Sequence, residues 1–307
     1  MKILVVGAGA TGGYFGGRLA AAGRDVTLLV RERRAAMLRE RGLRLLTPSD
    51  TIEVTPKIVQ AEGLDHPFDL IILAVKAYGL ETALSDLEPA VGRDTLIVPL
   101  LNGLRHIDRL KQRFGEGPVL GGVCAIGAAL TLEGDVRQAM EGAQLTYGEL
   151  AGGMSDRVWR LDAELQDAGF TARLSANIVQ DLWTKWVMLA TLGATTCLMR
   201  APIGEIEAAP GGLAFLEGAL DEAWTIAEAA GYPPAPEALA RIRGMVTAKG
   251  SPMTSSMYRD MMAGAAVEVD AILGDLVLRA EALGRPCPRL GAARTALEIY
   301  ASTARIA

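Results

Sequence analysis

The residues with the clearest chemistry begin at position 7, in the run Gly7-Ala8-Gly9-Ala10-Thr11-Gly12, which follows the apolar segment Ile3–Val6. In this spacing the first glycine permits a tight turn and the second lets the backbone approach a pyrophosphate. The third lets a helix pack closely on a strand. The phosphates would then bind the free N–H groups at the N-terminus of that helix. The motif predicts a dinucleotide-binding βαβ unit at the start of the chain.

The residue after the second apolar run distinguishes between the two nicotinamide dinucleotides. Sites for NAD place Asp or Glu about 20 residues after the glycines, where the carboxylate accepts from the ribose 2′-hydroxyl. Here Val26–Val30 is followed by Arg31, nineteen residues after the last glycine of the motif. A guanidinium suits a 2′-phosphate, which a carboxylate would repel. Glu32 would in principle serve NAD, whereas Arg33 and Arg34 add positive charge, although as surface residues they would simply be solvated. We therefore predict NADP(H).

Polar residues also follow two later apolar runs. Leu70–Val75 leads directly into Lys76, and Leu96–Leu101 leads into Asn102-Gly103. Ligands of open α/β sheets bind at the carboxyl ends of the strands, so both side chains are expected at the cofactor site. The structural alternatives are a solvated strand end for Lys76 and a turn residue before glycine for Asn102.

One charge stands out in the second half of the chain. Lys185 lies in the apolar helical segment Ile178–Met199, and no further charge follows it until Arg200. A lone cation in such a helix is costly unless it has a partner or a purpose. The alternative is a lysine that extends from a core helix into solvent.

These residues need elements to position them, and the first half of the chain alternates apolar runs with helical segments. The four runs named above are typical of strands buried on both faces of a parallel sheet. Helices are predicted between them at Gly13–Ala22, Arg34–Arg41, Leu80–Leu87 and Ile107–Phe114. This alternation predicts an α/β fold with a Rossmann-type doubly wound sheet. Shorter pieces at Val119–Ile126, Asp135–Ala139 and Gln144–Glu149 predict a hairpin-like extension.

The second half has a different character. After a helix near Asp156–Ala168 and a short piece at Phe170–Leu174, β-type runs disappear. The predicted helices are Ile178–Met199, Gly212–Ala230, Pro236–Ala248, Ser255–Leu283 and Leu290–Ala301. We expect an NADP-binding Rossmann domain over residues 1–174 and an all-helical substrate and catalytic domain over residues 175–307.

Composition excludes several classes of partner. The 307 residues are 50% hydrophobic and carry a net charge of −5, which argues against a nucleic-acid or anionic-membrane surface. Cys124, Cys197 and Cys287 share no CxxC spacing, and there are two histidines, so neither a disulfide framework nor a metal site is expected. The uncharged stretch Trp186–Met199 is shorter than the ~20 residues of a membrane span. We expect a cytoplasmic protein whose partner is a small molecule, and its long apolar C-terminal helices are compatible with a homodimer.

Along nearly its whole length the chain resembles the ketopantoate reductase (2-dehydropantoate 2-reductase) family. The glycine motif, Arg31, Val75-Lys76-Ala77, Asn102-Gly103 and the helical second half carry the resemblance. It implies that NADPH reduces the 2-oxo group of ketopantoate to the hydroxyl of pantoate, a step towards pantothenate and coenzyme A. It also implies that Lys76 and Asn102 line the path from the adenine ribose to the nicotinamide, and that the helical domain is of the 6-phosphogluconate dehydrogenase type.

The resemblance also assigns roles on the helices. Lys185 matches the family's general acid, which protonates the developing alkoxide. Ser256 and Glu268 are twelve residues apart, the spacing of the family's substrate-binding serine and its catalytic-site glutamate. The implied roles are substrate binding for Lys185, Ser256 and Asn102, and for Glu268 pairing with Lys185 and contact with the nicotinamide ribose. The alternatives are a helix N-cap for Ser256 and a solvated carboxylate for Glu268.

The chain departs from the family at three positions. The family has asparagines four and eight residues after the lysine and one in the next loop, where this chain has Leu189, Gly193 and Ile203. The first two share a helix face with the lysine, so polar contacts near the substrate are lost, each worth about 1 kcal/mol.

The departure leaves other functions open. A reductase of the same fold acting on a more apolar 2-oxo acid or ketone is the first alternative, of which an opine-type or β-hydroxyacid dehydrogenase is an example. A non-catalytic NADP(H)-binding sensor is the second, and the retained Lys185 and Glu268 speak against it.

Overall fold

The computed structural model describes residues 1–304, and the chain divides into two compact units. The first unit comprises Met1–Leu101 and His106–Ile178. The second comprises Asn102–Arg105 and everything from Val179 onward. The short segment 102–105, which follows a strand of the first unit, is thus grouped with the second.

A five-stranded parallel sheet forms the centre of the first unit. Its strand order is β5-β2-β1-β6-β7, with bounds Lys57–Val59, Asp25–Leu29, Lys2–Val6, Leu70–Leu73 and Leu96–Pro99. Every residue of β6 and β7 is buried, as expected for strands covered on both faces. Val6 pairs with Leu29 on one side and Leu73 on the other, so three strands end level. The strand β2 lies on one side of β1, and β6, which follows later in the chain, lies on the other side. This order confirms the doubly wound sheet and places its switch point between β1 and β6.

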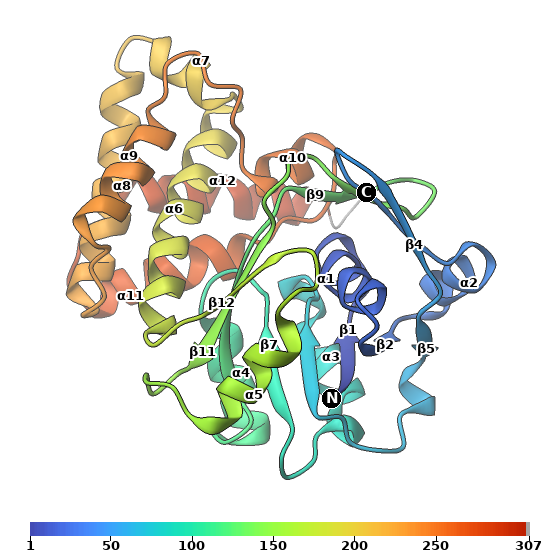
Figure 1. The fold of residues 1–307 in the computed structure, drawn as a ribbon. Coiled ribbons are helices and arrows are strands. Elements are labelled where there is room, and N and C mark those ends of the chain that lie inside the picture. The colour runs from blue at the N-terminus through green and yellow to red at the C-terminus, as the bar shows by residue number, and fades with distance from the viewer. Residues whose placement is uncertain (305–307) are drawn as a thin grey trace. The chain divides into compact units, whose positions relative to one another are not determined.

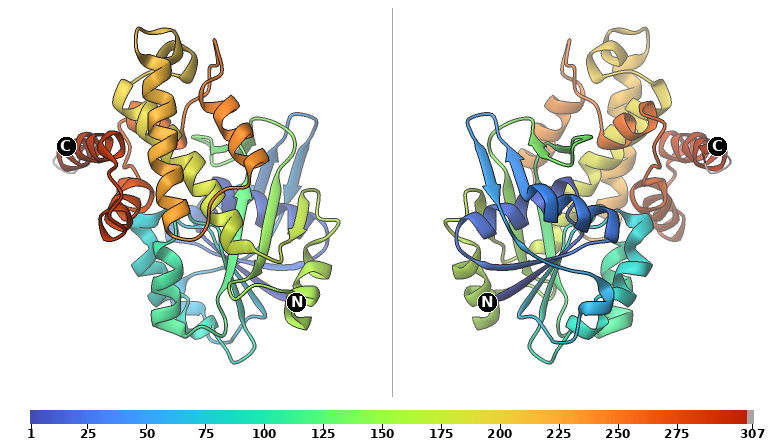
Figure 2. Two further views of the ribbon diagram at one scale, coloured as in Figure 1. Left: turned by 90° about the vertical axis from the view of Figure 1, so that its left-hand side faces the viewer. Right: turned by 90° about the vertical axis from the view of Figure 1, so that its right-hand side faces the viewer.

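Helices cover both faces of this sheet. They are α1 (Ala10–Ala21), α2 (Glu32–Arg41), α3 (Leu80–Asp86) and α4 (Arg105–Phe114), with single 3₁₀ turns at Ala61–Gly63, Ala77–Gly79 and Glu88–Ala90. Figure 2 shows α1 on the opposite face of the sheet from α3 and α4. The helix α1 begins inside the glycine motif, three residues before its predicted start, and a Cβ on its Gly16 would lie 3.2 Å from Leu28 of β2. The glycines therefore bring this helix close to the sheet.

Two smaller sheets complete the first unit. One has the order β4-β3-β10-β9 (Thr51–Val54, Leu43–Leu46, Val136–Gln138, Ala128–Leu130), and the other β12-β11-β8 (Thr171–Leu174, Gln144–Glu149, Leu120–Ala125). The helix α5 (Asp156–Leu165) precedes β12. The predicted hairpin-like extension corresponds to the antiparallel β8 and β11, while β10 joins β3 in parallel instead. The strands β3, β4, β5 and β9 are short and partly exposed, and no sequence pattern predicted them.

The second unit is helical. Its elements are α6 (Ile178–Met199), α7 (Ile203–Ala208), α8 (Gly212–Ala229), α9 (Pro236–Val246), α10 (Ser256–Met262), the π-helical turn η4 (Asp270–Gly274), α11 (Asp275–Ala282) and α12 (Pro288–Ala304). The central α8 packs against α7, α9, α11 and α12 (Figure 1). Its buried Leu216, Leu220, Ala223 and Ala227 recur at helical spacing and form the packed stripe.

A buried carboxylate links two of these helices. Glu222 of α8 is 7% exposed and accepts hydrogen bonds from the backbone N–H groups of Arg289 (3.0 Å) and Leu290 (3.0 Å). The guanidinium of Arg289 also donates to it at 2.9 Å. A carboxylate at the first turn of α12 satisfies otherwise unpaired donors and complements the helix dipole.

The prediction of one helix over Ser255–Leu283 is wrong. The helix α10 ends at Met262, Gly264 adopts a left-handed φ of +70°, and the chain is irregular until a π-helical turn begins at Asp270. The hydroxyl of Tyr300 donates to the carbonyl of Ala265 at 2.8 Å, which helps to hold the interruption. Ser256 and Glu268 therefore do not lie on one continuous helix.

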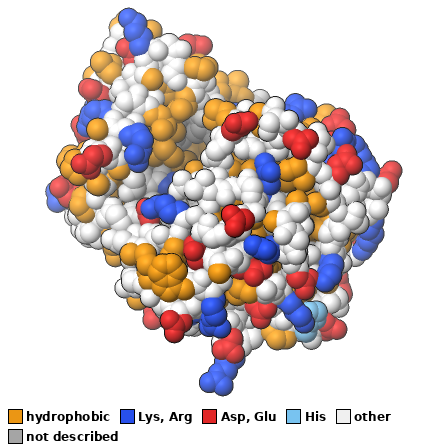
Figure 3. All heavy atoms as spheres, in the orientation of Figure 1, with side chains coloured by type: hydrophobic (Ala, Val, Ile, Leu, Met, Phe, Trp, Pro, Cys, Tyr) orange, Lys and Arg blue, Asp and Glu red, His pale blue; other side chains and the backbone are white. Residues whose placement is uncertain are grey.

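The surface is mixed in character. On the face drawn in Figure 3, Lys and Arg side chains are interspersed with Asp, Glu and exposed hydrophobic side chains. Within residues 1–304, none of the helices combines the length and apolar character that crossing a bilayer requires.

Candidate active site

The glycine motif lies at the switch point of the parallel sheet. Gly7 follows β1 with φ +90°, donates its N–H to the carbonyl of Leu29 (3.0 Å), and would place a Cβ only 3.0 Å from Val75. A Cβ on Gly12 would lie 2.0 Å from the carbonyl oxygen of Gly7. Both positions therefore exclude any side chain, the first for its backbone conformation and the second for its close helix-to-turn contact.

The middle glycine is open to its surroundings. A Cβ on Gly9 would meet no atom within 4 Å, and no side chain caps the N-terminus of α1 at this residue. Its carbonyl accepts from Gly13 (2.8 Å), so the helix starts there with its first N–H groups directed outward. This loop fits a dinucleotide pyrophosphate, which needs backbone donors at a helix N-terminus and no side chain in the way.

Arg31 stands at the start of α2, where its backbone is the N-cap. Its carbonyl accepts from Arg34 (3.0 Å) and Ala35 (2.9 Å), while its exposed side chain has no hydrogen bond or ion pair within residues 1–304. Glu32, the carboxylate that would serve NAD, instead lies 3.8 Å from the guanidinium of Arg39. The guanidinium of Arg31 is therefore available to a ligand, and the neighbouring carboxylate lies near a second arginine.

Arg34 is a structural residue that sequence reasoning missed, because it was expected to be a solvated surface side chain. It is half-buried, and its guanidinium donates to the carbonyls of Ala8 (2.9 Å) and Gly134 (2.7 Å). Burial lowers the pKa of this guanidinium, and the carboxylate of Asp135 opposes the shift. Arg34 thus ties the glycine loop to a turn a hundred residues away, for which the sequence contains no local signal.

Lys76 and Asn102 follow β6 and β7 respectively. Lys76 is exposed and begins the 3₁₀ turn Ala77–Gly79, with its carbonyl accepting from Gly79 at 2.8 Å. Asn102 is half-buried, and the next residue, Gly103, has φ +78°. A Cβ on Gly103 would lie 2.2 Å from the carbonyl oxygen of Ala271. The Asn102 loop is therefore held directly against η4, at Ala271, which lies three residues after Glu268 in the chain.

Lys185 lies on α6 at the level of the same π-helical turn. It is half-buried, and the next residue, Trp186, is 1% exposed and donates its indole N–H to the carbonyl of Ile272 (2.9 Å). Glu268 is 7% exposed, and its carbonyl accepts from Ile272 at 3.1 Å. The helix of Lys185 and the segment of Glu268 thus meet at Ile272, within a π-helical turn of the kind often found at functional sites. Neither Lys185 nor Glu268 is without an interaction partner.

The structure separates Ser256 from the capping role considered for it. The N-cap of α10 is Ser255, whose hydroxyl accepts from Tyr258 (2.9 Å) and lies 2.9 Å from that of Thr196. Ser256 is half-buried, and its hydroxyl has no hydrogen-bond partner within the described chain. That hydroxyl is therefore available to a ligand.

The three departures from the family pattern lie in different environments. Leu189 is half-buried on α6, one turn from Lys185. Gly193 is buried, and a Cβ there would lie 2.7 Å from the terminal methyl of Met257. Ile203 is fully buried at the start of α7, and its N–H donates to Met253 (3.0 Å). At Gly193 the methyl of Met257 thus lies where a longer side chain would begin.

Comparison with known proteins identifies the family to which the chain belongs. A family model described as ketopantoate reductase PanE/ApbA matches residues 3–152, and its C-terminal counterpart matches residues 177–300. The chain belongs to the ketopantoate reductase family. Members of this family are oxidoreductases, and the observed Rossmann and helical units are those expected of it.

Individual relatives span the full chain. The uncharacterized oxidoreductase YkpB of Bacillus subtilis (strain 168) is 33% identical over 300 residues, covering 98% of this chain and 99% of its own. The 2-dehydropantoate 2-reductase of Halobacterium salinarum is 31% identical over 285 residues, covering 91% and 92%. Among solved structures, D-mandelate dehydrogenase with NADH and anilino(oxo)acetate has a TM-score of 0.89 at 23% identity, covering 99% of this chain and 100% of its own. The last of these shows a shared fold.

Proposed function

We propose that this protein is an NADPH-dependent reductase that converts a 2-oxo acid to the 2-hydroxy acid, with ketopantoate as the first substrate to be tested. The observation that carries the proposal is the meeting of the Lys185 helix, the Glu268 segment and the Asn102 loop at η4. In a chain of this family, with an open glycine loop, that arrangement supports a catalytic centre.

NADP(H) is the proposed cofactor. The open backbone at Gly9 suits the pyrophosphate, and the guanidinium of Arg31, which is unpaired among residues 1–304, suits a 2′-phosphate. Lys76 would hold the cofactor at the end of the adjacent strand. When bound, NADPH supplies the hydride that reaches the 2-oxo carbon.

The chain's own residues then handle the proton and the substrate. The ammonium of Lys185 donates a proton to the oxygen on which negative charge develops. The buried carboxylate of Glu268 orients Lys185 and contacts the nicotinamide ribose. The hydroxyl of Ser256 and the amide of Asn102 donate hydrogen bonds to the substrate.

A second candidate substrate is a 2-oxo acid with a wholly apolar side chain. It is favoured by Leu189 and by Met257, whose methyl lies against Gly193, since these groups present carbon where the family pattern has amides. A protein of the same fold is D-mandelate dehydrogenase, and mandelate is a 2-hydroxy acid with a phenyl side chain.

A matched pair of substrates separates the two candidates. We would compare kcat/KM for ketopantoate with that for 3,3-dimethyl-2-oxopentanoate, in which a methyl group replaces the ketopantoate hydroxyl. A site that hydrogen-bonds the hydroxyl should favour ketopantoate by a factor of about 10⁴. If kcat/KM for ketopantoate is no greater than that for the analogue, the substrate is an apolar 2-oxo acid. If the protein turns over none of ketopantoate, the analogue and phenylglyoxylate, the reductase proposal is contradicted.

A further inference from the structure

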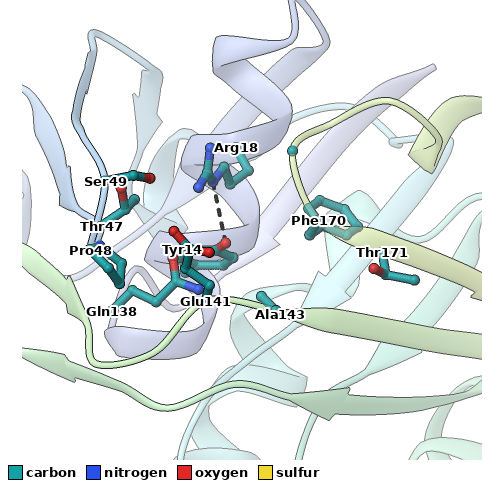
Figure 4. Close-up of a pocket in the computed structure, with 12 residues that line it drawn as sticks. Tyr14, Arg18, Thr47, Pro48, Ser49, Gln138, Glu141, Ala143, Phe170 and Thr171 are labelled. Carbon is teal, nitrogen blue, oxygen red and sulfur yellow. Dashed lines mark hydrogen bonds between the residues drawn. The ribbon is translucent and has the colours of Figure 1, made fainter.

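A cavity lies in the first unit, on the surface of α1 beyond the glycine loop. It has a volume of about 380 Å³, within the range of small-molecule sites. Four segments line it: α1, the β3–β4 turn, the end of β10 with its connection to β11, and the start of β12 with the two residues before it (Figure 4). None of the residues assigned above to cofactor or substrate lines this cavity.

The cavity contains a positive charge that is held in place without a counter-ion. The guanidinium of Arg18 lies 5.4 Å from the ring centre of Tyr14 and donates to the Tyr14 hydroxyl at 3.3 Å, drawn as a dashed line in Figure 4. A Cβ on Gly169 would lie 2.9 Å from an Arg18 nitrogen, so the glycine leaves room for it. Within residues 1–304, no carboxylate forms an ion pair with this half-buried side chain. An anion would therefore find a preorganised partner here.

The cavity also contains a side-chain amide that no described residue pairs with. Gln138 is 6% exposed, lines the cavity, and forms no side-chain hydrogen bond with any described residue. Figure 4 shows its side chain extending towards Tyr14. The amide oxygen and nitrogen of Gln138 are open to the cavity rather than sealed in the core. They offer a ligand one hydrogen-bond acceptor and one donor group.

The rest of the lining limits the class of ligand. Glu141 is exposed and contributes a negative charge opposite in sign to Arg18, which disfavours phosphates and dicarboxylates and favours an ammonium group. Phe170 and Pro48 add apolar surface. We propose that this cavity binds a free amino acid, with its carboxylate on Arg18 and Gln138, its ammonium facing Glu141, and its side chain against Phe170 and Pro48.

Three ligands with the same carbon skeleton test the proposal. Calorimetric titration of the full chain, with NADP⁺ at saturation, would compare L-leucine with 4-methylpentanoate, which lacks the amino group, and with isoamylamine, which lacks the carboxylate. Leucine should bind at least tenfold more tightly than either analogue. If leucine does not bind, or if 4-methylpentanoate binds equally well, the assignment to an amino acid is overturned.

Two variants connect the binding to the named residues. Arg18→Met should abolish leucine binding while NADPH affinity, which reports an intact first unit, stays unchanged. Glu141→Gln is an exposed change and should weaken leucine at least fivefold without affecting 4-methylpentanoate. The exposed Arg160→Gln is the matched control and should bind leucine normally. Wild-type leucine affinity in Arg18→Met or in Glu141→Gln would refute the site.

Discussion

The side chain of Arg31 carries the proposed preference for NADPH. One charged hydrogen bond to a 2′-phosphate is worth about 1.5–3 kcal/mol, or roughly a 10- to 100-fold change in affinity. Arg31→Ala should therefore raise the KM for NADPH by about that factor and leave the KM for NADH nearly unchanged. Initial rates with each cofactor measure the two values.

The neighbouring Arg33 provides the control, because it is also exposed and no cofactor contact is proposed for it. Arg33→Ala should change neither KM substantially. Equal increases for NADPH and NADH in Arg31→Ala would show that the guanidinium does not contact the phosphate.

Lys185 is the residue to which the proton transfer is assigned. Removing a general acid costs about 10²- to 10⁴-fold in rate, so Lys185→Ala should lower kcat by that order. The dissociation constant for NADPH, measured by fluorescence titration, should stay nearly the same. Thr184→Ala is the matched control, since its hydroxyl bonds only within the helix, to the carbonyl of Gln180 (2.8 Å) and the amide of that same residue (3.4 Å). A Lys185→Ala enzyme with normal kcat would remove the lysine from the mechanism.

At the scale of elements, the strand ends and the long helices were predictable because their signals are local. The runs that became β1, β2, β6 and β7 are almost continuously apolar, and α6 was predicted with its observed bounds. The break after α10 was not predictable from periodicity, since its hydrogen bond comes from Tyr300, 35 residues further along. The contact from Arg34 to Gly134 is equally non-local.

Gly103 connects the Asn102 loop to η4. Comparing its replacement with that of Gly115 distinguishes the cost of backbone strain at positive φ from the cost of a steric clash with η4. Both Gly103 and Gly115 have positive φ, +78° and +79°, yet a Cβ meets the Ala271 carbonyl only at Gly103. Gly115→Ala should cost about 1 kcal/mol in unfolding free energy, whereas Gly103→Ala should cost about 2–4 kcal/mol. Urea denaturation measures both, and equal costs would show that the contact with η4 contributes nothing.

A carboxylate at the end of β11 makes stability depend on pH. Glu149 accepts from Arg157 (2.6 Å) and from Ser155, the N-cap of α5, and the hydrogen bond from Arg157 is the main reason that its pKa is lowered below 4.5. A carboxylate whose pKa is lowered by folding stabilises the protein at any pH above its pKa in the unfolded chain. This contribution is lost as the pH falls through the lower pKa of the folded state. Glu149→Gln should therefore cost about 1–3 kcal/mol at pH 7 and much less at pH 3.

Urea unfolding of both proteins at the two pH values tests this dependence. Glu53→Gln is the control, because Glu53 is 67% exposed in its pair with Arg44 and should contribute less than about 1 kcal/mol at either pH. A stability gap for Glu149→Gln that does not narrow in acid would contradict the account.

At the scale of the whole molecule, the two halves of the proposed site differ in how far sequence could predict them. The glycine motif and Arg31 belong to one βαβ unit, so their spacing alone indicated a cofactor loop. Lys185, Glu268 and Asn102 lie far apart in the chain, and only a family resemblance connected them. The packing of Gly103 and Trp186 on η4 supplies the physical connection, which no pattern in the sequence contains.

The central claim is that a hydride passes from NADPH to the 2-oxo carbon of an acid on this protein. The most direct measurement is to supply NADPH carrying deuterium at both C4 positions of the nicotinamide and to analyse the product by mass spectrometry and proton NMR. The account predicts a 2-hydroxy acid one mass unit heavier, with the deuterium on C2 and the C2 proton signal absent. A product without deuterium at C2, or no product from any 2-oxo acid supplied, would contradict it.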